Sequence, residues 1–132
     1  MEGKCMTGEP LKRDLLKKMI IAKIDIAAYL SLRKAKGYMS VIETEHLRDN
    51  LFDLSTEYRE KAIRLKFHLA AQEMESINHG MSAVCSAGVC LMTGRHDCPQ
   101  YIAIDAEKLE SCLSELSDSL KDIMGHQLAV ES

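Results

Sequence analysis

Apolar residues recur every three or four positions between residues 10 and 37, which is the spacing of one face of an α-helix. Pro10 can occupy the first position of such a helix, and Gly37 is the next residue that would end it. The main apolar positions are Leu15, Met19, Ala22, Ile26 and Tyr29, and those that widen the face are Leu16, Ile20, Ile24, Ala27 and Ala28. The pattern predicts a helix of about 40 Å with a broad buried face.

A second and longer helix is predicted to begin at Ser40. The Ser40 hydroxyl can accept a hydrogen bond from the amide of Glu43 while the Glu43 carboxylate returns to the Ser40 amide, which is a capping box. No proline or glycine follows until Gly80, so the pattern predicts one helix of about 60 Å that ends over residues 78–80. Its apolar face consists of Leu47, Leu51, Leu54, Tyr58, Ala62, Leu65 and Leu69. A second apolar stripe, also expected to be covered, consists of Ile63, Phe67, Ala70, Met74 and Ile77.

The last third of the chain predicts two more helices. Helical spacing continues from Met81 as far as Gly94, so a short third helix is expected there. A fourth helix is predicted from Pro99 to Gly125. Its apolar positions follow alternating steps of four and three, namely Ile102, Ala106, Leu109, Leu113, Leu116, Leu120 and Ile123. The competing interpretation is a strand over 101–104 and a helix from Asp105; the continuous helix is favoured because Ile102 lies in register.

These elements predict an all-α fold: a long antiparallel helical hairpin, a short third helix, and a fourth helix that packs back on them as a bundle. The 132 residues allow one domain, spanning 1–132, with flexible termini expected over 1–9 and 126–132. The chain is 46% hydrophobic with a net charge of -3, which excludes a disordered tail. It contains no apolar stretch that could span a membrane and no signal-peptide core at its start, so the cytoplasm is the expected compartment.

Charge is distributed unevenly along the chain. Residues 1–36 contain nine Lys and Arg against four Asp and Glu, a balance of +5, whereas residues 37–132 contain eight against sixteen, a balance of -8. A basic and an acidic half attract each other, within one chain or between two copies. We therefore expect self-association, with a homodimer as the simplest form.

Basic residues near the start of the chain form one candidate binding patch, namely Lys12, Arg13, Lys17 and Lys18. Such a patch suits phosphate groups, so nucleic acid is one candidate partner. Against this, the chain as a whole is acidic, and its helices are too long for a helix-turn-helix. The alternative is that these side chains face acidic residues of the last helix or of a protein partner.

The five cysteines are an odd number and favour free thiols in a reducing compartment. Cys85, Cys90, His96 and Cys98 together form a Cys3His set, which is a set that binds structural zinc. If residues 81–93 are helical, however, Cys85 and Cys90 lie about 140° apart around the axis and could not share one ion. The alternative is that these thiols pack as small apolar groups. No cofactor is expected, and zinc is the one alternative that the cysteines and His96 leave open.

Cys98 is also a candidate redox thiol. If Pro99 begins the last helix, Cys98 is its N-cap residue, where the helix dipole favours a thiolate. Cys90 would then be a candidate resolving partner for the oxidised thiol. A metal- or thiol-sensing protein is therefore the main alternative function.

Protein–protein interaction is the function that the pattern favours most. The helices have more apolar edge than a bundle of this size easily covers, and methionines suit adaptable contacts. The expected partner-interface residues are Leu109, Leu113, Leu116, Leu120, Met74 and Met81, although a filled monomeric core would explain the same residues. The sequence has no nucleophile elbow, phosphate-binding glycine loop or His-Glu-x-x-His motif, so an enzyme is not expected. We expect a regulator, an adaptor or a protein of the secretion-chaperone type.

Overall fold

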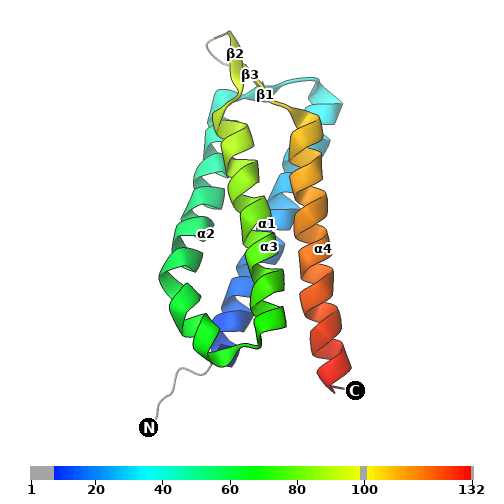
Figure 1. The fold of residues 1–132 in the computed structure, drawn as a ribbon. Helices are drawn as coiled ribbons and strands as arrows, with labels where there is room; N and C mark the ends of the chain where they lie inside the picture. Colours follow the sequence, from blue (N-terminus) through cyan, green and yellow to red (C-terminus); the bar gives the residue numbers. More distant parts are fainter. Residues whose placement is uncertain (1–7, 99–100, 132) are drawn as a thin grey trace.

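The computed structural model describes residues 8–98 and 101–131, and it describes the side chains of residues 10–94 and 101–125. Four helices form a bundle in which successive helices alternate in direction (Figure 1). They are α1 (Gly8–Lys36), α2 (Val41–His68), α3 (Ala71–Met92) and α4 (Ala106–Glu131). The predicted all-α bundle is confirmed. Within the described residues, no helix combines the length and the apolar character needed to cross a membrane.

The single helix predicted over residues 40–80 is wrong, because the chain turns back at Leu69 and Ala70. Both residues are extended, with ψ of 151° and 153°, and the amide of Ala70 donates a hydrogen bond to Glu73 Oε1 at 3.3 Å. The turn lets α3 pack antiparallel to α2, so apolar residues of both helices share one core. Gly80, predicted to end a helix, instead lies buried inside α3, and the third helix is therefore long rather than short.

A small sheet at one end of the bundle is the second difference from prediction. It consists of β1 (Met39–Ser40), β2 (Arg95–Cys98) and β3 (Tyr101–Ala103), with antiparallel pairing in the order β1-β3-β2. The continuous helix from Pro99 is thus wrong and the competing strand is correct, since α4 begins only at Ala106. Ile102 pairs with Met39, and both side chains are buried, so pairing with a distant segment overrides the helical register. At its other end α4 continues through Gly125, the predicted stop, to Glu131. Of the termini predicted to be flexible, residues 1–7 and 132 lie outside the described part.

The core runs along the axis of the bundle and includes residues of every helix. Its largest fully buried aliphatic and methionine side chains are Met19, Ile26, Met39, Leu51, Leu65, Ile77, Val84, Leu91, Leu109, Leu116 and Ile123. Two buried polar groups are satisfied across the helices. The hydroxyls of Tyr29 and Thr44 share a hydrogen bond at 2.7 Å, and the Ser119 hydroxyl donates to the carbonyl of Ser76 at 2.5 Å.

Candidate interaction surfaces

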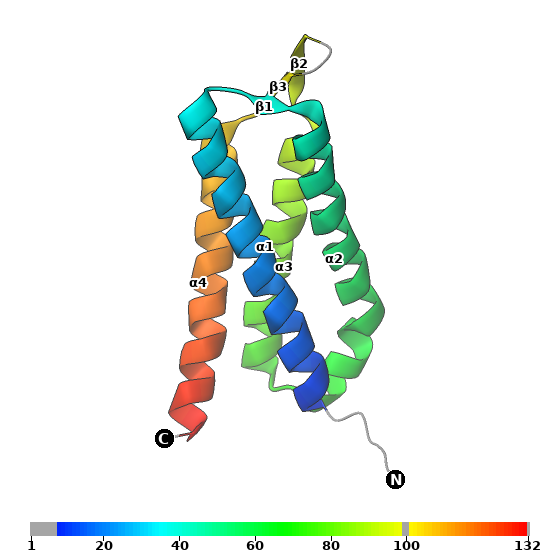
Figure 2. The ribbon, with the colours of Figure 1, turned by 180° about the vertical axis from the view of Figure 1, so that it is seen from behind.

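Helix α1 lies across one face of the bundle, between α2 and α4 (Figure 2). Its first half lies beside the second half of α2, whereas its second half leans toward the start of α4. Between residues 18–32 of α1 and 43–57 of α2 there is a groove, which we call the acidic groove. It consists of two hollows of about 240 and 290 Å³. Asp25 and Asn50 line both hollows, so the two form one continuous groove.

The two walls of the acidic groove have the spacing that helices use when they pack together. The lining residues of α1 include Ile21, Asp25, Ala28 and Leu32, and those of α2 include Glu43, Leu47, Asn50, Leu54 and Glu57. Steps of four and three place each set along one line of its helix. The α1 wall rises over about 16 Å, which matches three turns of a further helix. The groove therefore has the length and pattern to accept a helix from another protein.

Apolar side chains remain uncovered along α1 next to this groove. Ile21 is 49% exposed and Ile24 is 59% exposed, whereas the core residue Ile26 on the same helix is fully buried. The sequence pattern assigned Ile24 to a broad buried face, and that assignment is wrong. Ile24 lies about 160° around the α1 axis from the buried residues Ala22 and Ile26, so it faces away from the core.

Four carboxylates give the acidic groove its charge, namely Asp25, Glu43, Asp53 and Glu57. Lys18, which also lines the groove, is already paired: its Nζ lies 2.6 Å from Glu57 Oε2 and 3.2 Å from Asp14 Oδ2. A hydrogen bond from Lys18, and a second one from Lys61 with a smaller effect, lower the pKa of Glu57, so this carboxylate stays ionised. Asp25 and Asp53 have no ion-pair partner among the described residues. The groove thus offers unpaired negative charge beside apolar surface.

A second uncovered surface lies where α2 turns into α3, and we call it the hairpin-end surface. It consists of Ala62, Ile63, Lys66, Phe67, Leu69, Met74 and Glu75, and most of these residues line a hollow of about 690 Å³. Phe67 is 81% exposed and Ile63 is 70% exposed. The second apolar stripe of the sequence was expected to be covered, and at these two residues that expectation is wrong for the chain by itself.

The partner-interface residues expected from the sequence lie in three different places. Leu109, Leu116, Leu120 and Met81 are buried in the core of the chain itself, as the filled-core alternative supposes. Leu113 is half-buried in the groove between α1 and α4, and Met74 is half-buried at the hairpin-end surface. The most exposed apolar residues, Ile42, Phe67 and Ile63, were not among those expected. Helical periodicity shows which apolar residues share one face of a helix. It does not show which of two apolar faces the fold leaves exposed to solvent.

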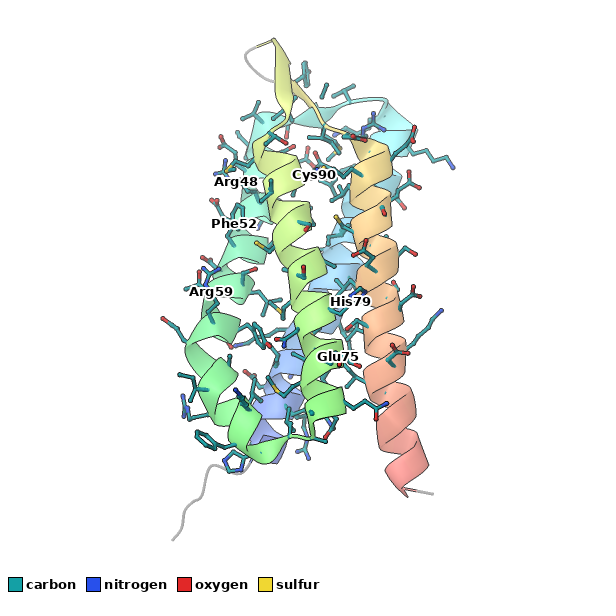
Figure 3. The ribbon with its side chains drawn as sticks, viewed as in Figure 1. Arg48, Phe52, Arg59, Glu75, His79 and Cys90 are labelled. Carbon is teal, nitrogen blue, oxygen red and sulfur yellow. The ribbon has the colours of Figure 1, made fainter. Side chains whose placement is uncertain are left out.

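The cysteines on α3 do not converge. Because residues 71–92 form one helix, Cys85 and Cys90 lie about 140° apart around its axis and cannot ligate one ion together. Cys90, labelled in Figure 3, is buried, and its thiol donates a hydrogen bond to the carbonyl of Asp105 at 3.4 Å. Among the described residues no group of three or more His, Cys, Asp or Glu could hold a metal. The side chains of His96 and Cys98 lie outside that part, so a metal role for them stays a prediction.

Cys98 does not occupy the position on which its redox hypothesis depended. Its backbone belongs to β2 and pairs with Tyr101, whereas the next helix begins at Ala106. The helix dipole that was expected to favour a thiolate is therefore not at Cys98, and the proposed N-cap is wrong. Asp105 has that position instead, and its Oδ1 accepts a hydrogen bond from the amide of Lys108 at 3.1 Å.

Cys90 and Cys112 are expected to resist alkylation by iodoacetamide at neutral pH while the chain is folded. Both are buried, and burial raises the pKa of each thiol, so little reactive thiolate forms. Mass spectrometry of peptides should show slower labelling at both than at the half-buried Cys85, and rapid labelling of all three in guanidinium chloride. Labelling of Cys90 as fast as Cys85 in the folded chain would contradict its placement.

Two lysines of the predicted basic patch are paired within the chain. Lys12 is buried, and its ammonium group donates to Glu73 Oε2 on α3, while Lys18 pairs with Glu57 on α2. Arg13 and Lys17 remain exposed. The carboxylates that pair with Lys12 and Lys18 thus belong to α3 and α2. These carboxylates were expected on the last helix. Pairing leaves a smaller cationic surface than the sequence suggested, and nucleic-acid binding stays a prediction without support from the geometry.

The fold defines a small four-helix-bundle protein with uncovered apolar surfaces, one of them lined by carboxylates. Residues 6–131 match the family described as biofilm formation protein YliH/BssR, and the chain belongs to this family. Biofilm regulator BssR of Escherichia coli K12 is 49% identical over 115 residues, which cover 87% of this chain and 91% of the relative. Biofilm regulator BssR proteins of Escherichia coli O157:H7 and Shigella flexneri match to the same extent. No solved structure matches the chain.

Proposed function

We propose that this chain is a non-enzymatic regulator of biofilm formation that acts by binding another protein in the acidic groove. The single observation behind the mechanism is an apolar groove with carboxylates on both walls and with the exposed Ile21 in its lining. The regulatory role is supported by relatives that are named biofilm regulators.

The partner segment that fits this groove is a basic amphipathic helix of about three turns. Its apolar side would cover Ile21 and Leu32, and its lysines or arginines would lie near Asp25 and Asp53. Opposite charge would favour the correct partner and its orientation, while the apolar contact would supply most of the affinity. An acidic helix would be rejected because it would bring like charges together.

Reversing the two unpaired carboxylates of the groove, with Asp25→Lys and Asp53→Lys, is expected to abolish function without unfolding the chain. Both side chains are at least partly exposed, so the fold should tolerate the change, while the affinity for a basic helix should fall at least about tenfold. The chain is expressed in an Escherichia coli K12 strain that lacks its own BssR, and adherent biomass is measured. The wild-type chain should restore the parental level, and the double variant should not.

The matched control is the double variant Glu60→Lys and Glu115→Lys. It makes the same change in net charge at exposed positions outside the groove, and it should restore the parental biomass. Affinity purification with mass spectrometry should then recover a protein that the control variant retains and the groove variant loses. Full restoration of biomass by the groove variant would contradict the proposed mechanism.

A further inference from the structure

The hairpin-end surface has two parts that complement each other in shape. Phe67 and Ile63 project from α2 one helical turn apart, and both are mostly exposed. Ile63 is part of the lining of the hollow of about 690 Å³, together with the apolar residues Ala62, Leu69 and Met74. Phe67 is outside that lining, because it lies about 140° around the α2 axis from Ala62. The surface therefore has both a projecting branched side chain, Ile63, and an apolar depression beside it.

The charges at this surface are also arranged in a complementary way. Lys66 lies on the α2 wall of the hollow and Glu75 on the α3 wall, and neither has an ion-pair partner within the described residues. Glu75 lies in the first half of α3 (Figure 3). Lys66 is four positions before Ala70, and Glu75 is five positions after it, so the two lie at similar distances from the turn between the helices.

We propose that a second copy of this chain docks on the hairpin-end surface and forms a symmetric dimer. A two-fold axis parallel to α2 and α3 would place the α2 wall of each copy against the α3 wall of the other. Lys66 of each copy then faces Glu75 of its partner, and the exposed Ile63 of each copy packs against the apolar lining of the partner's hollow. One cation and one anion on opposite walls suit a second copy better than a strongly acidic or basic partner.

The dimer leaves the acidic groove open. Asn50 in the groove and Lys66 at the hairpin-end surface are sixteen positions apart on α2, which places them about 160° apart around its axis. The two surfaces therefore lie on opposite flanks of this helix. A symmetric dimer would present two acidic grooves, and the inference does not depend on the function proposed for them.

Sedimentation of the full chain should show a monomer–dimer equilibrium, and Ile63→Ser should weaken the dimer at least about tenfold. The substitution Ile24→Ser is the matched control, because it removes the same type of side chain from a position on α1 that is 59% exposed, against 70% for Ile63. It should leave the equilibrium unchanged. Thermal unfolding measured by circular dichroism should show that both variants remain folded. A wild-type chain that stays monomeric at every concentration would overturn the proposal.

Charge reversal tests the arrangement of the two copies. K66E alone puts two carboxylates against each other across the interface, and E75K alone puts two ammonium groups against each other. Each single variant should therefore dimerise about tenfold more weakly than the wild type. Mixing the two variants in equal amounts should restore dimers, because every pair across the mixed interface is then opposite in charge. Dimers of K66E as stable as the wild type, or no dimers in the mixture, would overturn the two-fold arrangement.

Discussion

Replacing Gly80 by valine is expected to lower the free energy of unfolding by about 2–3 kcal/mol. A Cβ atom at this position would lie 2.5 Å from both Met19 Cε and Ser119 Oγ, and 3.1 Å from Ser119 Cβ. The Met19 side chain can shift, but the Ser119 hydroxyl is held by its hydrogen bond to the carbonyl of Ser76. A branched side chain at Gly80 would therefore force α1 or α4 away from α3.

Urea denaturation followed by circular dichroism measures this effect, and Gly125→Ala is its control. Gly125 also lies within a helix, but no atom lies within 4 Å of a Cβ placed there. Alanine at that position should raise the free energy of unfolding by about 0.5–1 kcal/mol, because alanine favours the helix more than glycine does. Equal stability of Gly80→Val and the wild type would show that the three helices do not meet at Gly80.

Replacing Glu73 by alanine is expected to lower the free energy of unfolding by about 3 kcal/mol. The carboxylate accepts a hydrogen bond from the ammonium group of Lys12, whose side chain is only 6% exposed. Without Glu73, a buried positive charge loses this partner while its desolvation cost remains. The same substitution also removes the hydrogen bond from the amide of Ala70 at the start of α3.

The matched control is Glu57→Ala, which removes a carboxylate that pairs with lysines nearer the surface. The side chain of Lys18 is 39% exposed, so water replaces much of the lost interaction, and the expected loss is below about 1 kcal/mol. Both variants are compared with the wild type by urea denaturation at neutral pH. Equal losses for Glu73→Ala and Glu57→Ala would contradict the burial of Lys12.

The beginning of α2 shows how much local sequence can predict. The N-cap proposed at Ser40 is confirmed: the amide of Glu43 donates to Ser40 Oγ at 3.1 Å, and α2 begins at Val41. The returning bond of the predicted capping box differs, because Glu43 Oε1 accepts from the Ser40 hydroxyl at 2.9 Å and not from the Ser40 amide. The buried positions Leu47, Leu51, Leu54 and Leu65 all belong to the predicted apolar face. These features depend on residues three or four positions apart, so the periodicity of the helix is enough to predict them.

The break at Leu69 and Ala70 shows where local sequence was not enough. No glycine or proline marks it, and the chain turns there because α3 can then cover apolar residues of α2. Ile102 is similar, since it fits the helical spacing of α4 but is buried by pairing with Met39. In both cases a contact with a segment distant in sequence outweighed a local preference.

The candidate surfaces likewise have some features that local sequence predicts and others that only the packing of the helices decides. Spacing along the chain was sufficient to group Ile63 and Phe67 on one stripe, because a helix places residues four positions apart together wherever it lies. Met74, which was predicted to continue this stripe, lies on α3 instead. The spacing could not show that Phe67 remains exposed, or that α1 and α2 leave between them a groove lined with carboxylates. Exposure depends on which other segment covers a residue, and the directions in which whole helices pack settle that question.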